Sequence, residues 1–103
     1  MGKYVAIYTG YPAEDSDPHA VRASWEQWFR DLGAAVIDPG SVFTAARTVT
    51  LDGSVIDGNR TKLTGYTILA ADDLDAAAAM VTQCPGLANA AIEVYEAVGL
   101  DAV

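Results

Sequence analysis

Four residues in this sequence have side chains suited to binding a small molecule: Tyr8, Arg22, Trp25 and Asp38. Arg22 stays protonated near neutral pH and can bind an anion, whereas Asp38 is the one candidate for an acid or base. Tyr8 and Trp25 each combine an apolar ring with a polar atom. These side chains would present one cation and one carboxylate to an aromatic or keto-acid ligand. Two structural alternatives stay open: a salt bridge between Arg22 and Asp38, or a turn formed by Asp38 and the Pro-Gly that follows it.

Other reactive side chains have simpler explanations. His19 is expected in the first turn of a helix, opposite its apolar stripe, and therefore in solvent. Cys84 has no obvious histidine partner and is expected to be a small buried hydrophobe. Asp72, Asp73 and Asp75 resemble a metal-binding cluster, but capping of a helix explains them. We therefore predict no metal site and no cofactor.

The acidic composition argues against several classes of partner. The net charge is −8, the pI is near 4.2, and the six basic residues form no run. Nucleic acids and anionic membranes require clustered Lys and Arg, so neither is an expected partner. We also expect no leader, no membrane span and no internal disulfide, since no apolar run is long enough and only one cysteine is present. The expectation is a cytoplasmic protein that folds as one domain over residues 1–103.

A strand and a helix in the first third of the chain would position Tyr8, Arg22 and Trp25. Residues 3–9 are β-branched and aromatic, which predicts a strand. Asp17 suits a helix N-cap, Pro18 suits the first helical position, and Gly33 is placed to end the helix. The apolar stripe of this helix has the spacing i, i+4, i+7, i+8 and i+11 and consists of Val21, Trp25, Trp28, Phe29 and Leu32. The flank of the stripe holds Arg22, whose guanidinium can reach a pocket mouth.

The rest of the sequence predicts a short strand, a hairpin, a strand, a second helix and a last strand. These elements are expected at residues 34–37, at 47–51 with 54–56, at 65–71, from Asp73 onward, and at 91–96. Asp52-Gly53 is the expected two-residue hairpin turn, and Asp72 is the expected cap of the second helix. The buried face of that helix is predicted to contain Leu74, Ala77, Ala78 and Val81. Two strand–helix–strand halves joined by a meander are typical of an α+β, ferredoxin-like fold, with an antiparallel sheet covered by two helices on one face.

The alternation of side chains along the strands predicts an aromatic sheet face. If Val5 and the other aliphatic side chains face the helices, the tyrosines gather on the opposite face; these are Tyr4, Tyr8, Tyr66 and Tyr95. An uncovered face rarely carries so much aromatic surface. We therefore predict a homodimer joined through this tyrosine-bearing face. The tyrosines either pack against the second subunit or line a pocket between the subunits, and the two alternatives are compatible.

Three segments resemble the YCII-related proteins, including their DGPF branch. They are the opening strand KYVAIYTG, the helix end FRDLG at 29–33, and GYTILAADDLDAAAAMVTQCP at 65–85 followed by AIEVYEA. The resemblance covers nearly the whole chain and implies a dimeric α/β barrel with a ferredoxin-like protomer.

The resemblance does not extend to the proposed active site of that family. Family members commonly pair an aspartate with a histidine that lies eleven residues before the glycine ending the first helix, and Arg22 occupies that position here. Asp38-Pro39-Gly40 is only reminiscent of the Asp-Gly-Pro-Phe segment. An arginine cannot act as a base near pH 7 because it stays protonated.

Two functions are therefore predicted. The first is a homodimeric YCII-related protein with a small-molecule pocket and without an intact His-Asp catalytic pair. The alternative is a small enzyme, similar to a lyase, a dehydrochlorinase or an isomerase, that acts on an aromatic or anionic metabolite. In both cases the pocket is expected between the sheet and the first helix, with Tyr8, Arg22, Trp25 and Asp38 on its wall.

Overall fold

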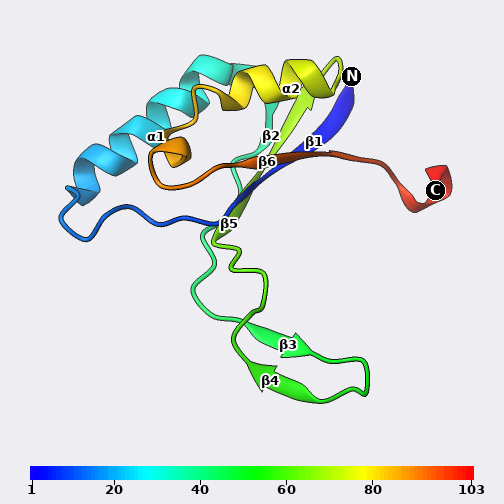
Figure 1. The fold of residues 1–103 in the computed structure, drawn as a ribbon. Helices are drawn as coiled ribbons and strands as arrows, with labels where there is room; N and C mark the ends of the chain where they lie inside the picture. The colour runs from blue at the N-terminus through cyan, green and yellow to red at the C-terminus, as the bar shows by residue number, and fades with distance from the viewer.

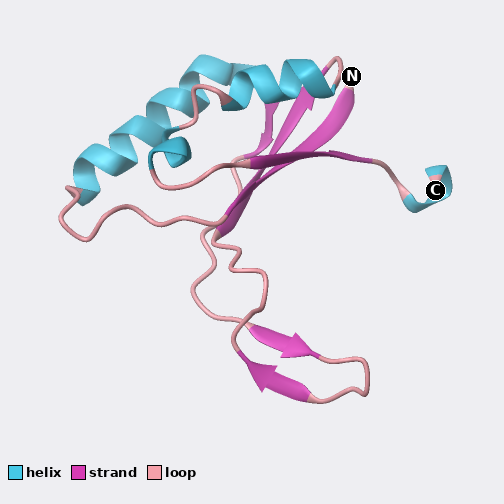
Figure 2. Ribbon diagram, viewed as in Figure 1, coloured by secondary structure: helices cyan, strands magenta, loops and turns pink.

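The structure, a computed structural model, describes all 103 residues as a four-stranded sheet, a separate two-stranded hairpin and two α-helices (Figures 1 and 2). The sheet strands are β1 (Gly2–Tyr8), β2 (Val36–Asp38), β5 (Gly65–Ala71) and β6 (Glu93–Ala97). The hairpin strands are β3 (Arg47–Val49) and β4 (Val55–Asp57). The helices are α1 (Pro18–Leu32) and α2 (Leu74–Val81), and short 3-10 turns occupy Gly33–Ala35 (η1), Pro85–Ala88 (η2) and Leu100–Ala102 (η3).

The strand order of the sheet is β2-β5-β1-β6, and every neighbouring pair is antiparallel. Both helices cover the same face of this sheet (Figure 1). This arrangement confirms the predicted α+β, ferredoxin-like fold. Neither α-helix has the length and apolar character needed to cross a membrane.

The first helix begins and ends where the sequence predicts. The Asp17 side chain accepts a hydrogen bond from the His19 N–H, Pro18 is the first helical residue, and Gly33 follows the last turn with φ of +56°. Trp28 is the buried residue of the apolar stripe, and its indole N–H donates to the Met80 carbonyl at 3.1 Å. This bond joins α1 to α2 inside the core.

The cap of the second helix lies one residue later than predicted. Asp73, not Asp72, accepts a hydrogen bond from the Ala76 N–H at 2.8 Å, and α2 begins at Leu74. Asp73 has the extended backbone that an N-cap needs, so its carboxylate can bend back over the first turn.

The buried face of α2 is narrower than predicted. Ala77 and Val81 are buried, but Leu74 and Ala78 are exposed, because this short helix contacts the sheet along a single line of side chains. The flanking strands also shift by a residue or two from their predicted positions. β2 begins at Val36 because the preceding residues form the η1 turn, and β6 begins at Glu93.

The predicted tyrosine face is wrong, since the four tyrosines divide between the two faces of the sheet. Tyr4 and Tyr8 point toward the helices, whereas Tyr66 and Tyr95 share the opposite face. Tyr4 is only 3% exposed and packs against alanine side chains of β5 and α2. These small side chains leave space under α2 that a long aromatic ring fills and a valine would not.

The face of the sheet turned away from the helices, which we call the open face, is still apolar. Its side chains, half-buried or exposed, come from three strands and include Val5, Ile7, Tyr66, Ile68 and Tyr95. Val5, Ile7 and Ile68, which were expected to face the helices, therefore lie on this uncovered surface.

The hairpin is present as predicted, but its loop contains three residues rather than two. The Thr50 N–H donates to the Ser54 carbonyl, and the Gly53 N–H donates back to the Thr50 carbonyl, both at 2.9 Å. Gly53 has φ of +87°, as the last residue of such a loop requires. The hairpin strands pair only with each other and extend away from the end of the sheet (Figure 1).

Candidate functional site

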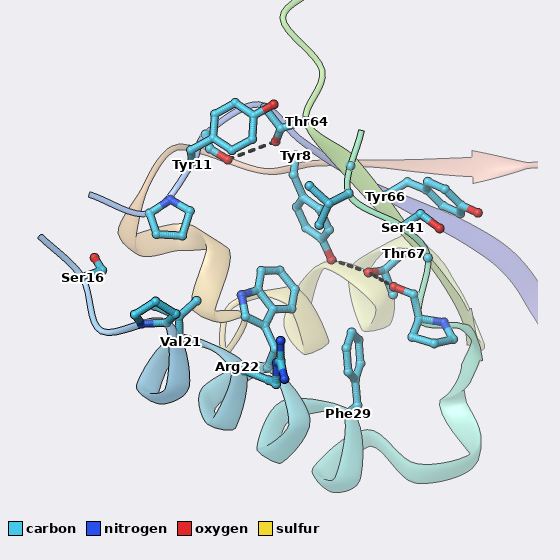
Figure 3. Close-up of a pocket in the computed structure, with 18 of the residues that line it drawn as sticks. Tyr8, Tyr11, Ser16, Val21, Arg22, Phe29, Ser41, Thr64, Tyr66 and Thr67 are labelled. Carbon is cyan, nitrogen blue, oxygen red and sulfur yellow. Dashed lines mark hydrogen bonds between the residues drawn. The ribbon is translucent and has the colours of Figure 1, made fainter. Parts of the chain in front are cut away.

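A cavity of about 630 Å³ lies between α1 and the helix-covered face of the sheet (Figure 3). Its remaining walls come from residues of the loop after β1, at positions 10–16, and of the loop after β2, at positions 39–42. Its size falls within the range of about 300–1,000 Å³ that is usual for small-molecule sites.

Three of the four predicted binding residues line this cavity. Tyr8 enters from the end of β1, and Arg22 and Trp25 project from α1 beside Phe29. They meet because α1 lies across the helix-covered face and the phase of β1 directs Tyr8 toward that same face. The fourth predicted residue, Asp38, does not line the cavity.

A chain of hydrogen bonds holds the Tyr8 phenol at the inner wall. Its hydroxyl donates to Thr67 Oγ1 at 2.6 Å, and the Thr67 hydroxyl donates to the Pro39 carbonyl at 3.0 Å (Figure 3). The Cys84 thiol donates to the phenol oxygen, with Sγ 4.0 Å away. Burial raises the pKa of Tyr8 well above its usual range and raises the pKa of Cys84 as well. Both groups are therefore protonated near neutral pH, and the phenol is a fixed hydrogen-bonding group rather than a base.

Aromatic rings make up much of the apolar wall. The Trp25 ring meets Tyr8 edge to face at 5.2 Å between centroids and lies 5.9 Å from the Phe29 ring. A β-carbon at Gly86 would lie 3.3 Å from the Trp25 ring, so the glycine lets the η2 backbone pack closely against it. The Trp25 indole N–H has no hydrogen-bond partner within the chain, unlike the N–H of Trp28. Because no side-chain donor without a partner is buried, the Trp25 N–H is accessible from outside the protein. The Trp25 N–H is therefore free to donate to a ligand.

Arg22 is the cation of the cavity wall. The residue is exposed, and its guanidinium forms no salt bridge; the single salt bridge of the structure joins Arg47 and Asp57, at 2.8 Å. The alternative of a salt bridge between Arg22 and Asp38 is therefore wrong. An unpaired guanidinium at a cavity can bind an anion through its planar fork of N–H donors.

Asp38 has a local structural role instead. One of its carboxylate oxygens accepts the Gly40 N–H at 2.8 Å, and the other accepts the Tyr66 hydroxyl at 3.3 Å. This is the turn alternative considered for Asp38. A register shift in the pairing of β2 with β5 places Asp38 opposite Ile68, on the open face. Without that irregularity, regular alternation from Val36 would have turned Asp38 toward the helices and the cavity.

Several polar residues of the cavity wall were not identified from the sequence. Glu14, from the loop after β1, and Ser41, from the loop after β2, both line the cavity, and Figure 3 shows Ser41 at its edge. Gly10 and Pro12 indicated a loop after β1. The amino-acid sequence of a loop does not show which part of the folded protein it borders, so these residues could not be assigned to the cavity. His19 is exposed and does not line the cavity, and the structure contains no group of three His, Cys, Asp or Glu residues placed to hold a metal ion.

Comparison with known proteins gives a likeness in fold. No protein-family model matches the chain, and no curated protein matches it in sequence. Among solved structures, the 5-chloro-2-hydroxyhydroquinone dehydrochlorinase of Burkholderia phenoliruptrix AC1100, in complex with 2,5-dihydroxybenzoquinone, is similar to it with a TM-score of 0.61. The similarity covers 97% of each chain at 18% sequence identity. Over nearly its whole length, the chain therefore has a fold similar to that of this dehydrochlorinase.

Proposed function

We propose that this chain is a YCII-related protein that binds a small, planar, anionic molecule in the cavity beneath α1. The observation that carries the proposal is the unpaired guanidinium of Arg22 on the same wall as the rings of Trp25 and Phe29. The sequence resemblance to YCII-related proteins and the fold shared with a quinone-binding dehydrochlorinase also support it.

The chemistry of the walls favours a flat ring that carries acidic oxygens. Aromatic side chains contact such a ring over its faces and edges, and an arginine binds a carboxylate or an enolate through two parallel N–H donors. The Trp25 N–H and the Ser41 hydroxyl, neither of which has a partner within the chain, can bond to further oxygens. Hydroxyquinones and aromatic carboxylates combine these features, so they are the ligand classes that we propose.

Replacement of Arg22 by alanine is expected to weaken ligand binding by about 10- to 100-fold. A hydrogen bond to a charged group contributes about 1.5–3 kcal/mol, and each 1.4 kcal/mol is about tenfold in affinity. Binding is measured by calorimetry with 2,5-dihydroxybenzoquinone and with a panel of aromatic carboxylates that thermal shift has first identified as ligands.

Arg30→Ala is the matched control for this prediction. Arg30 lies on the same helix, is exposed, and donates to Gln27 rather than lining the cavity. The Arg30→Ala substitution removes the same charge as Arg22→Ala and should leave the affinity for the ligand unchanged. Equal losses in the two variants would show that net charge, not a contact in the cavity, governs binding.

An enzyme that acts on the same class of compound is the second candidate. The observation in its favour is Glu14, a carboxylate on the cavity wall, because a base within hydrogen-bonding reach of a bound substrate can remove a proton. Incubation of each bound compound with the protein, followed by absorbance, distinguishes the two candidates. Turnover that disappears in Glu14→Gln while binding persists would favour the enzyme, and binding without turnover would favour the binding protein.

We also propose that the protein is a homodimer joined through the open face of the sheet. Val5, Ile7 and Ile68 give this face the apolar character of an interface, although the tyrosines that led to the prediction are only half present there. An obligate interface of this kind buries about 2,000 Å² or more. Light scattering at micromolar concentration should return twice the chain mass of 10.8 kDa, and a value of 10.8 kDa would contradict the proposal.

A further inference from the structure

Residues 43–63, which we call the arm, project from the body of the protein and expose apolar side chains. The arm leaves the end of the sheet, on the side away from the helices, and carries β3 and β4 at its far end (Figure 2). Leu51 at the tip is fully exposed, and Val49 and Val55 are 68% and 64% exposed. An isolated two-stranded hairpin is at best marginally stable in water, so contact with a further surface would stabilise this arm.

The exposed side chains form one patch. Val49 pairs with Val55 across the hairpin, and paired residues share a face, so these two valines lie side by side next to the tip residue Leu51. The Arg47–Asp57 pair borders them on the same face. This is the pattern of a small apolar contact with a charged rim.

The tip of the arm is ordered by its own hydrogen bonds. The Asp52 carboxylate accepts the Thr50 hydroxyl and the Ser54 N–H, and these bonds lower the pKa of Asp52 to about 2. The base is also anchored, since the Phe43 N–H donates to the Thr64 carbonyl at 2.9 Å. A preformed arm loses little conformational freedom when it docks.

The charge of the arm is opposite to that of the rest of the chain. The arm holds three of the six basic residues but only two of the 14 acidic ones, so its net charge is +1 while that of the remaining residues is −9. The arm of one copy is therefore attracted to the acidic body of another, although two whole chains repel each other.

The dimensions of the chain also indicate a missing partner. Its radius of gyration is 15.2 Å, whereas a compact domain of this length has about 13 Å. Its accessible surface is 7126 Å², against about 5,500 Å² for a globular monomer of this mass. The excess is of the size that one subunit buries in an obligate homodimer.

We infer that the arm is an intersubunit arm, which docks its patch of Val49, Leu51 and Val55 on a second copy of this chain. The inference rests on the homodimer proposed above and adds to it a second contact outside the sheet. The arm extends beyond the sheet, where it can reach around a copy seated on the open face (Figure 1). Charge complementarity favours a second copy as the occupant, and the excess surface area is of the size that such an interface would bury.

The test is the dimer dissociation constant of Val49→Asp/Leu51→Asp, measured by sedimentation velocity. We expect it to rise at least about 100-fold, because two charges enter an apolar contact that the arm can no longer make. Leu100→Asp/Val103→Asp adds the same two charges at apolar positions that are 92% and 95% exposed, outside the arm, and should leave the constant near that of the wild type. Val49→Ser/Leu51→Ser tests the loss of apolar contact without added charge. Because all these positions are exposed, the far-ultraviolet circular dichroism should be unchanged.

The outcomes separate the arm from the dimer itself. A dimer whose dissociation constant is unchanged in both arm variants would overturn the inference and leave the proposed sheet-face dimer unaffected. A wild-type protein that is monomeric would overturn the dimer and the inference together. Neither result bears on ligand binding by the cavity, which is tested separately with Arg22→Ala.

Discussion

Replacement of Trp28 by alanine is expected to lower the free energy of unfolding by about 3–5 kcal/mol, the usual cost of emptying a buried aromatic site. Trp28 is 4% exposed and packs in the main core cluster with Leu69 and Val81. The substitution also removes the indole donor that holds the Met80 carbonyl. Urea denaturation monitored by circular dichroism measures the change.

Two further substitutions define the origin of the Trp28 effect. Trp28→Phe keeps most of the ring and loses the hydrogen bond, so it should cost less than the alanine variant. His19→Ala changes an exposed side chain in the first turn of α1 and should stay within about 0.5 kcal/mol of the wild type. A larger loss in His19→Ala than in Trp28→Ala would mean that the helix is rotated relative to the structure.

Replacement of Gly40 by alanine is expected to destabilise the protein by about 2–5 kcal/mol, although it adds a single methyl group. Gly40 has φ of +84°, a conformation that costs an alanine about 1–2 kcal/mol. In addition, its β-carbon would lie 1.6 Å from the Tyr66 carbonyl oxygen, so the loop would have to move away from β5. Such a displacement adds an overpacking cost of about 1–3 kcal/mol. It would also deform the cavity wall, which includes Pro39 and Ser41.

Gly53→Ala is the matched control for the Gly40 prediction. Gly53 has nearly the same backbone conformation, with φ of +87°, but nothing lies within 4 Å of the position of its β-carbon. Its substitution should therefore cost only the conformational part, about 1–2 kcal/mol. Similar losses at the two positions would show that the close packing of the loop on β5 does not contribute to stability.

Local interactions made several elements predictable from the sequence. The bounds of α1 follow from Asp17, Pro18 and Gly33, which act within one or two turns of their own position. β5 follows from the β-branched and aromatic residues at 66–68, and it ends where the acidic residues Asp72 and Asp73 begin the helix cap. The order of such elements was enough to predict a ferredoxin-like sheet with two helices on one face.

The sequence by itself placed Arg22 and Trp25 on the surface of α1 that borders the cavity, because residue type and helical spacing are local properties. Tyr8 was also predicted on the cavity wall, but the alternation along the strand had turned its side chain away from the helices. Which face of β1 turns to the core was decided by tertiary packing. Both faces are apolar, and the alanines of β5 and α2 that surround Tyr4 favour the tyrosine face of β1 on the inner side. The place of Asp38 was decided in the same way, since a single register shift against β5 reverses the direction of a side chain and no local pattern encodes it. Glu14 and Ser41 line the cavity because their loops run beside it. The course of each loop depends on contacts with strands that are distant in the sequence, and only the tertiary structure brings these loops and strands together.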